Sequence, residues 1–346
     1  MIRVDIAVLG AGIIGGMTAR EIAARAPSAS IALLDRAEVA GGASRRSAGL
    51  HFPRGGNARV RESTAYSHRF YEQLRSEQPE LPIFPVPMSV IASADTFEAE
   101  REKYLPLAGL TPAADFTHRF AKAPAETSVW HGHGCHYADV PALTAHLVNQ
   151  LRDRVVVREG VHVQGLEQTP DGIELRLATG ESIRAGRVVL APGPWLHADA
   201  WAPLVGPLGA RVKKVVALHI ADRPGPDDRL VVLHDEDAFL LPLRERGYWL
   251  FSYTCQEWDV TPDTLPTCLT GQDIAEARAV LGRYAPDLAS AASSGRVFCD
   301  AYSPDRTPLV QPLAGDPRLV FAGAANGSGY RLAPAIAKAA ADLVLG

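Results

Sequence analysis

The chain has 346 residues, 35 of them Lys or Arg and 39 Asp or Glu, giving a formal net charge of −4, and this length allows a large core and two domains. Without a block of basic residues or an apolar stretch near the ~20 residues of a membrane-spanning helix, we expect no nucleic-acid partner and no integral membrane segment. The N-terminus lacks a signal-peptide pattern and the 4 cysteines are scattered, which favours reduced thiols and a cytoplasmic location.

The N-terminal segment reads as a strand, a glycine turn, a helix and a second strand that ends in Asp35. Gly10 permits the tight turn, Gly12 lets backbone N–H groups approach a pyrophosphate, and Gly15 lets the helix pack close to the strand. Asp35 is placed to bind both hydroxyls of an adenosine ribose, and its charge argues against a 2′-phosphate. The segment predicts dinucleotide binding, with the helix N-terminus facing the phosphates, by Gly10, Gly12, Ile13, Ile14, Gly15, Asp35 and Arg36.

Apolar periodicity, caps and turn residues predict the remaining elements. After a small, polar loop at 41–49 we expect helices over 58–74, 96–107, 139–151, 273–284 and 333–344, the last with Pro334 in its first turn. The expected strands are 88–92, 155–157, 161–166, 173–177, 181–183, 187–190, 215–220, 230–233, 239–243, 248–253 and 319–322. Because no helices separate the strands between 214 and 254, they form an antiparallel sheet outside the parallel one. The fold class is therefore α/β: a Rossmann-type domain with a parallel sheet plus a second, α+β domain with an antiparallel sheet.

The order of these pieces resembles the D-amino-acid oxidase-like (DAO) family of FAD-dependent oxidoreductases, which includes glycine and sarcosine oxidases and D-arginine dehydrogenase. The resemblance covers nearly the whole chain. It is specific at the glycine fingerprint with Asp35, at Arg46-Ser47-Ala48-Gly49, at Ala191-Pro192-Gly193, and at Tyr302-Ser303-Pro304-Asp305-Arg306-Thr307-Pro308-Leu309 followed by Gly327-Ser328-Gly329-Tyr330. It implies FAD as the cofactor.

The glycine loop before the last helix agrees with this implication. Backbone N–H groups at a helix start can hold the flavin's pyrimidine carbonyls and N1, where negative charge develops on reduction. In addition to the first set, the expected FAD contacts are Gly42, Ser44, Arg45, Arg46, Ser47, Ala48, Gly49, Val161, Ala191, Gly193, Trp195, Gly327, Ser328, Gly329, Tyr330 and Arg331.

The resemblance also implies a domain division. Residues 1–80, 135–213 and 296–346 are expected to form a discontinuous FAD-binding domain, and residues 81–134 and 214–295 a substrate-binding domain.

Hydride transfer to flavin N5 needs no protein nucleophile, so we expect residues that position a substrate. Arg331 offers a planar fork for a carboxylate, although a surface arginine at a helix start fits the same pattern. Tyr330, Tyr253 and Tyr302 are candidates for shaping the pocket, with core packing as the alternative. His51, just past the flavin loop, either faces the substrate or satisfies a hydrogen bond in the core.

Two patterns separate the chain from sarcosine oxidases, and a third concerns metal binding. Sarcosine oxidases carry a covalent flavin on a cysteine, but Cys299 is displaced by about one residue from that pattern, so an inert thiol is the alternative. Those oxidases also have a lysine that promotes reaction with oxygen, and none stands near Trp249, which leaves oxidase or dehydrogenase open. The histidines at 131, 133 and 136 beside Cys135 match no common tetrahedral metal spacing, and the glycines between them favour a loose loop, so no metal is expected.

The expected function is FAD-dependent oxidation of the C–N bond of a small amine or amino acid by hydride transfer, giving an imine that hydrolyses. One alternative is a 2-hydroxy-acid dehydrogenase of the same fold, for which His51 is the candidate base. The other is a non-catalytic flavin subunit that relays electrons to a partner. Oxygen or another acceptor, and a partner subunit or a second copy of the chain, complete the expected partners.

Overall fold

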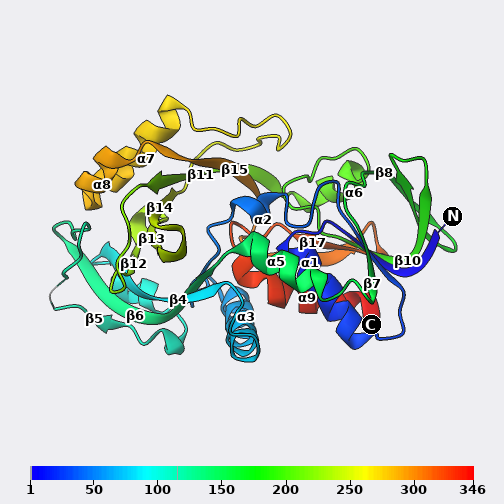
Figure 1. The fold of residues 1–346 in the computed structure, drawn as a ribbon, viewed down its shortest axis with the longest axis horizontal. Coiled ribbons are helices and arrows are strands. Elements are labelled where there is room, and N and C mark those ends of the chain that lie inside the picture. The colour runs from blue at the N-terminus through cyan, green and yellow to red at the C-terminus, as the bar shows by residue number, and fades with distance from the viewer. Residues whose placement is uncertain (1, 115) are drawn as a thin grey trace.

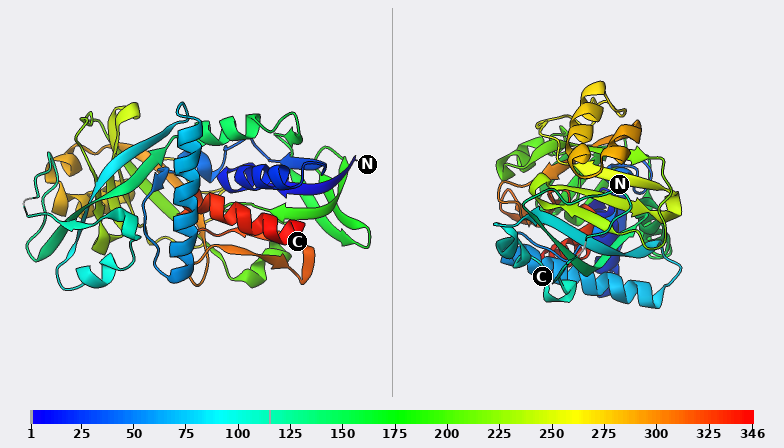
Figure 2. Two further views of the ribbon diagram at one scale, coloured as in Figure 1. Left: turned by 90° about the horizontal axis from the view of Figure 1, so that it is seen from below. Right: turned by 90° about the vertical axis from the view of Figure 1, so that its left-hand side faces the viewer.

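The structure is a computed structural model that describes residues 2–114 and 116–346. It has two lobes, each built around one β-sheet, and the long helix α3 (Ala58–Glu77) crosses between them (Figures 1 and 2). Both chain ends lie in the same lobe (Figure 1). No helix in the described ranges combines the length and apolarity needed to cross a bilayer.

The first sheet is the predicted dinucleotide-binding sheet. Its strands run in the order β16-β17-β10-β1-β2-β7, and β17, β10, β1, β2 and β7 are parallel. The hairpin β8–β9 pairs antiparallel with the start of β10. The strands are β1 (Ile2–Leu9), β2 (Ile31–Leu34), β7 (Val155–Arg158), β8 (Val163–Thr169), β9 (Gly172–Leu177), β10 (Ser182–Leu190), β16 (Leu309–Leu313) and β17 (Asp316–Gly323).

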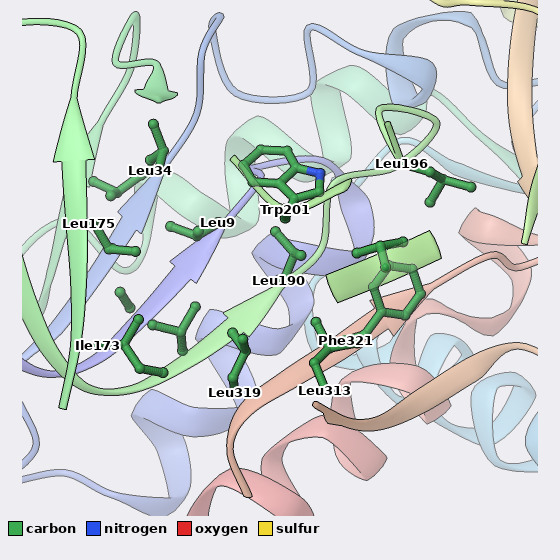
Figure 3. Packing of buried hydrophobic residues seen from close by; sticks show 14 of the residues in the cluster. Leu9, Leu34, Ile173, Leu175, Leu190, Leu196, Trp201, Leu313, Leu319 and Phe321 are labelled. Carbon is green, nitrogen blue, oxygen red and sulfur yellow. The ribbon is translucent and has the colours of Figure 1, made fainter. Parts of the chain in front are cut away.

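Alternation along the strands sends side chains to two separate cores. On one face, Ile6 and Val8 pack with α1 (Ile13–Arg25) and α9 (Gly329–Leu345). On the other face, Leu9 and Leu190 pack with β9 and with Trp201, in the segment after β10 (Figure 3). Because both faces are covered, the parallel strands read as continuous apolar runs.

The second sheet contains the strands predicted between 214 and 254, together with four strands from earlier in the chain and one from later. Its order is β15-β11-β14-β13-β12-β4-β6-β3, with β5 paired to β6, and all neighbours are antiparallel except β12 and β4. The strands are β3 (Leu50–His51), β4 (Ile83–Ser93), β5 (Thr111–Pro112), β6 (Thr127–Ala138), β11 (Arg211–Ile220), β12 (Leu230–Leu233), β13 (Ala238–Leu243), β14 (Tyr248–Tyr253) and β15 (Ser294–Tyr302). The predicted fold class is confirmed.

One face of this sheet packs against α7 (Gly271–Tyr284) and α8 (Pro286–Ala291). A capping box fixes the start of α7, because Thr270 accepts a hydrogen bond from the backbone N–H of Asp273 and the Asp273 carboxylate accepts one from the N–H of Thr270. The remaining helices are α2 (Ala43–Arg46), α4 (Phe97–Arg101), α5 (Val140–Asn149) and α6 (Ala202–Val205), with 3-10 turns at Pro106–Ala108, Gly206–Leu208, His234–Glu236 and Arg244–Arg246.

Four of the local predictions were wrong in detail. The segment 96–107 forms only the short α4 and a 3-10 turn, and the two strands predicted at 181–183 and 187–190 are one strand, β10. The histidine segment is no loose loop, because β6 pairs with β4 along its length. The last helix begins at Gly329, so Pro334 lies inside it.

Pro334 is tolerated inside α9 because of a tertiary hydrogen bond. A proline at this position has no N–H to donate to the carbonyl of Tyr330, four residues earlier. The Tyr71 hydroxyl, on α3, donates to that carbonyl instead, at 2.6 Å. The bond ties α3 to the first turn of α9.

Candidate active site

A cavity lies where the parallel strands end. Its volume is about 270 Å³, and its lining includes the residues at the carboxyl ends of β1, β2, β10 and β17. Open parallel sheets bind ligands at this edge. Because β2 and β17 lie on opposite sides of β1 in the sheet, the cavity has a β2 end and a β17 end.

The glycine turn after β1 can be made only by glycine. Gly10 has φ +101°, and a Cβ added there would lie 2.2 Å from the Ala191 carbonyl oxygen. A Cβ on Gly15 would lie 1.7 Å from the carbonyl oxygen of Gly10. The turn brings the N-terminus of α1 to the cavity, where its unpaired N–H groups and dipole favour an anion. Ser44 accepts a hydrogen bond from one of them, the N–H of Ile13, at 2.9 Å.

Asp35 marks the β2 end. Its carboxylate accepts hydrogen bonds from the N–H groups of Ala11, at 2.6 Å, and Ala37, at 2.8 Å. Burial raises the pKa of the Asp35 carboxyl, although both bonds oppose that shift. A carboxylate has about four acceptor positions, so it can still accept hydrogen bonds from two ribose hydroxyls.

A segment from the other lobe closes this end. Asp263 lies between β14 and α7, and its carboxylate accepts hydrogen bonds from Arg36, at 2.6 and 3.2 Å, and from Trp195, at 2.9 Å. The Arg36 guanidinium also lies 5.1 Å from the centre of the Trp195 ring. Arg36, Trp195 and Asp263 therefore form a clasp between the two lobes.

The β17 end combines the second glycine loop with β15. Gly327, with φ +72°, and Gly329 line it at the start of α9. Tyr302 lies against Gly327, because a Cβ on that glycine would meet the tyrosine hydroxyl at 3.2 Å. A helix N-terminus therefore faces the cavity at this end too.

These features fit FAD along its length. The α1 N-terminus suits the pyrophosphate, Asp35 the adenosine ribose, and the N–H groups at the start of α9 the flavin carbonyls. The predicted FAD contacts that line the cavity are Gly10, Gly12, Ile13, Ile14, Gly15, Asp35, Arg36, Gly42, Ser44, Ser47, Val161, Ala191, Gly193, Trp195, Gly327, Gly329 and Tyr330. Those outside the lining are Arg45, Arg46, Ala48, Gly49, Ser328 and Arg331.

Local contacts explain two of the residues outside the lining. Arg45 is exposed and forms an ion pair with Glu38. Gly49 packs against the end of β6, where a Cβ would lie 2.2 Å from the Ala138 carbonyl oxygen. These residues shape the loop around the cavity without facing into it.

The Arg331 guanidinium is already engaged by the chain. It donates to the Arg54 carbonyl at 2.9 Å and to the Ser328 hydroxyl at 2.7 Å, and it stacks on Phe52 at 4.6 Å. Burial, followed by the charge of Arg54, lowers the pKa of Arg331 to about 10. The predicted carboxylate fork is thus occupied within the chain, because one nitrogen donates to the loop after β3 and another to Ser328 at the start of α9.

Tyr253 and His51 lie outside the cavity lining, in the packed positions that were the second alternative for each. The Tyr253 hydroxyl donates to Glu276 of α7 at 3.0 Å, because this side of β14 packs on the helices. His51 is 0% exposed and stacks on His136, with ring centroids 4.5 Å apart. Its burial, followed by the charge of His136, holds the pKa of His51 well below its usual range.

Tyr330 and Tyr302 remain at the β17 end. Tyr330 lines the cavity and packs on Tyr71, with ring centroids 4.7 Å apart. Tyr302 packs edge-on against Trp258, at 5.3 Å between ring centroids. Tyr330 therefore forms part of the cavity wall, whereas Tyr302 packs behind Gly327, outside the lining.

Sequence reasoning missed Asp300, which lines the cavity beside Ala301. Burial raises the pKa of its carboxyl to about 7. An acid within the apolar run of β15 was the available sign, since carboxylates are rarely buried without a partner. Its neighbour Cys299 points to the opposite face and lies outside the cavity lining, and burial raises the pKa of its thiol to about 12.

Comparisons with known proteins agree with this geometry. A family model described as FAD dependent oxidoreductase, the DAO family, matches residues 5–343. No curated protein matches the sequence.

Among solved structures, a glycine oxidase from Geobacillus kaustophilus is 19% identical, with a TM-score of 0.80 over 100% of this chain and 95% of that one. An L-proline dehydrogenase from P. horikoshii is 16% identical, with a TM-score of 0.85 over 99% and 93%. An L-α-glycerophosphate oxidase from Mycoplasma pneumoniae, solved with FAD bound, is 16% identical, with a TM-score of 0.84 over 100% and 96%. At these identities the likeness shows the shared fold.

The family match covers nearly the whole chain, and it agrees with a cavity suited to FAD at both ends. The chain therefore belongs to the DAO family of FAD-dependent oxidoreductases, and it is an enzyme whose cofactor is FAD.

Proposed function

We propose that this enzyme oxidises the C–N bond of a small amine or amino acid, giving an imine that hydrolyses in water. The observation that carries the proposal is the position of His51. Oxidation of a hydroxy acid needs a base for the hydroxyl proton, and the histidine expected to serve is sealed in the core, outside the cavity lining. An amine brings its own nitrogen lone pair, so its oxidation does not need that histidine.

The names of the structural neighbours support the same substrate class. The glycine oxidase and the L-proline dehydrogenase are named for amino acids. The L-α-glycerophosphate oxidase is named for a hydroxylated compound, which keeps the hydroxy-acid reaction as the second candidate.

Bound FAD supplies the acceptor for a hydride. The chain's own residues would bind the cofactor and shape the space for the substrate. Backbone N–H groups of Gly327 and Gly329 would hold the flavin carbonyls, and Tyr330, with Tyr302 packed behind Gly327, would enclose the substrate and exclude water. Arg331 acts as a positioning residue, because it fixes the loop at Arg54 to the start of α9.

The test is anaerobic reduction of the purified holoenzyme by a panel of amines, amino acids and 2-hydroxy acids. We expect loss of the oxidised flavin absorbance with members of the amine or amino-acid set. Reduction by hydroxy acids alone would establish the second candidate instead. Repeating the reaction in air and with an artificial acceptor then separates an oxidase from a dehydrogenase.

We further infer the domain division into 1–80, 135–213 and 296–346 for FAD and 81–134 and 214–295 for substrate. The parallel strands β1, β2, β7, β10 and β17 fall in the first set, and β4 and β12–β14 in the second. β3 and most of β15 lie in the first set by residue number and pair in the second sheet, so they join the two units. A cytoplasmic location is likewise proposed, supported by free thiols at the cysteines.

A further inference from the structure

Asp300 is a carboxylate without a partner at the β17 end of the FAD cavity. It lies on β15 between the buried residues Cys299 and Ala301, and part of its surface faces the cavity. Within the described ranges, its carboxylate makes no hydrogen bond or ion pair with another side chain, and burial alone accounts for its raised pKa. Such a group costs stability unless a ligand supplies the missing partner.

The nearest cation does not neutralise Asp300. Lys213 of β11 stands directly opposite it in the antiparallel pair. The Lys213 ammonium nevertheless lies over the rings of Tyr302, at 4.7 Å, and Trp258, at 5.0 Å. The two rings therefore hold the Lys213 ammonium, and the Asp300 carboxylate, which lines the cavity, is left for a cationic ligand.

Resting on the proposed function, we propose that Asp300 binds the ammonium group of the substrate and accepts its proton. The step breaks one N–H bond and forms one O–H bond on the carboxylate, which leaves a neutral amine with a free electron pair. That pair is then available to form the C–N double bond, for which bound FAD would supply the hydride acceptor. The substrate class is thus an amine that arrives protonated at the nitrogen to be oxidised.

The proton balance favours an amine over an alcohol at this position. Burial sets the pKa of Asp300 at about 7, so the free carboxylate is ionised just above neutrality. Such a base can accept a proton from an alkylammonium at modest cost, whereas a hydroxyl is a far weaker acid. The titratable and charged groups around it are Lys213 on β11, Cys299 and Tyr302 on its own strand, Arg46 on α2 and Asp237 after the 3-10 turn at His234–Glu236.

The test uses ligands that bind but cannot react. 2-Aminoisobutyrate and tert-butylammonium have no hydrogen on the carbon that bears nitrogen, and 2-hydroxyisobutyrate is the matched hydroxy acid. Each is titrated into the holoenzyme while the flavin absorbance spectrum is followed. We expect at least one amine probe to bind on the order of tenfold or more tightly than the hydroxy acid, as one charge-assisted hydrogen bond predicts. Its affinity should rise with pH and level off above about 7.

The variant Asp300→Asn keeps the shape and removes the charge. It should lose both the preference for the amine probe and its pH dependence, while Asp227→Asn, an exposed acid between β11 and β12, should keep them. Asp300→Glu, which keeps the charge, should retain the pH dependence if the asparagine variant fails to hold FAD.

The outcomes separate this inference from the proposed function. If neither amine probe binds the wild type, or binding is independent of pH near 7, the inference is overturned without any variant. If amines reduce the flavin equally fast in wild type and Asp300→Asn, the proposed function stands and the inference falls. If no amine reduces the flavin yet Asp300 still governs binding of an amine probe, the ammonium site stands and the proposed function fails.

Discussion

The hydrogen bond from Tyr71 to the carbonyl of Tyr330 carries a quantitative prediction. Tyr71 is 0% exposed, and its hydroxyl is the donor that replaces the N–H missing at Pro334. Tyr71→Phe keeps the ring stacked on Tyr330 and leaves the buried carbonyl without a partner. An orphaned buried acceptor costs about 1–3 kcal/mol, so we expect the free energy of unfolding to fall by that amount.

The assay is urea unfolding of the holoenzyme at saturating FAD, followed by circular dichroism and flavin fluorescence. Tyr66→Phe is the control, since Tyr66 lies on the same helix and its hydroxyl makes no hydrogen bond within the described residues. Because Tyr330 lines the cavity, Tyr71→Phe should also weaken FAD binding, whereas Tyr66→Phe should not.

Pro334→Ala completes a double-mutant cycle. Alanine restores the N–H that donates to the Tyr330 carbonyl within α9, so it should stabilise the Tyr71→Phe background about 1 kcal/mol more than the wild type. A stability for Tyr71→Phe within about 0.5 kcal/mol of wild type, or a coupling energy of zero, would refute the reasoning.

Three further predictions concern the cavity. Gly15→Ala would place a Cβ 1.7 Å from the Gly10 carbonyl oxygen, so the variant should purify without FAD; normal flavin content would contradict the tight turn. The pKa of the Asp300 carboxyl is about 7 in the folded protein, against a usual 3.8. The free energy of unfolding of the wild type should therefore fall, by at most about 4 kcal/mol, as the pH rises from 3.8 to about 7. Thermal unfolding of Asp300→Asn should lack this decline. Asp263→Ala removes the acceptor for Arg36 and should speed FAD release several-fold in stopped-flow dilution; an unchanged rate would mean that the clasp between the lobes does not retain FAD.

Local patterns were sufficient where the backbone itself forms the site. The glycine turn, Asp35 and the loop before α9 were predicted because each depends only on residues that are neighbours in the sequence. The glycines permit a close approach, Asp35 follows the end of a strand, and the loop precedes the start of a helix. Side chains whose direction depends on distant partners could not be placed from the sequence. Tyr253 alternates correctly along β14, but only the packing of α7 decides that its face is the outer one.

His51 and Arg331 show the same dependence on tertiary contacts. His51 follows the flavin loop in sequence, yet α3 and β6 place His68 and His136 against it. Arg331 is two residues past a glycine that lines the cavity, yet the carbonyl of Arg54 takes up its guanidinium. Neither partner can be identified from the residues around the site, because each is brought in by a separate element.

The proposed ammonium site depends on the register of one strand pair. The Asp300 side chain reaches the cavity because Asp300 pairs with Lys213, and a slip of one residue would turn that side chain to the other face of the strand. Cys299 would then face the cavity, and the Asp300 carboxylate would enter the apolar core that Cys299 shares with Trp201 and Phe321. The bridge between Tyr302 and Ala325 ties the same strand to the loop that holds the flavin. The strand that carries Asp300 is therefore fixed at one side by β11 and at its end by the loop before α9, and these two contacts hold the acid in the cavity lining.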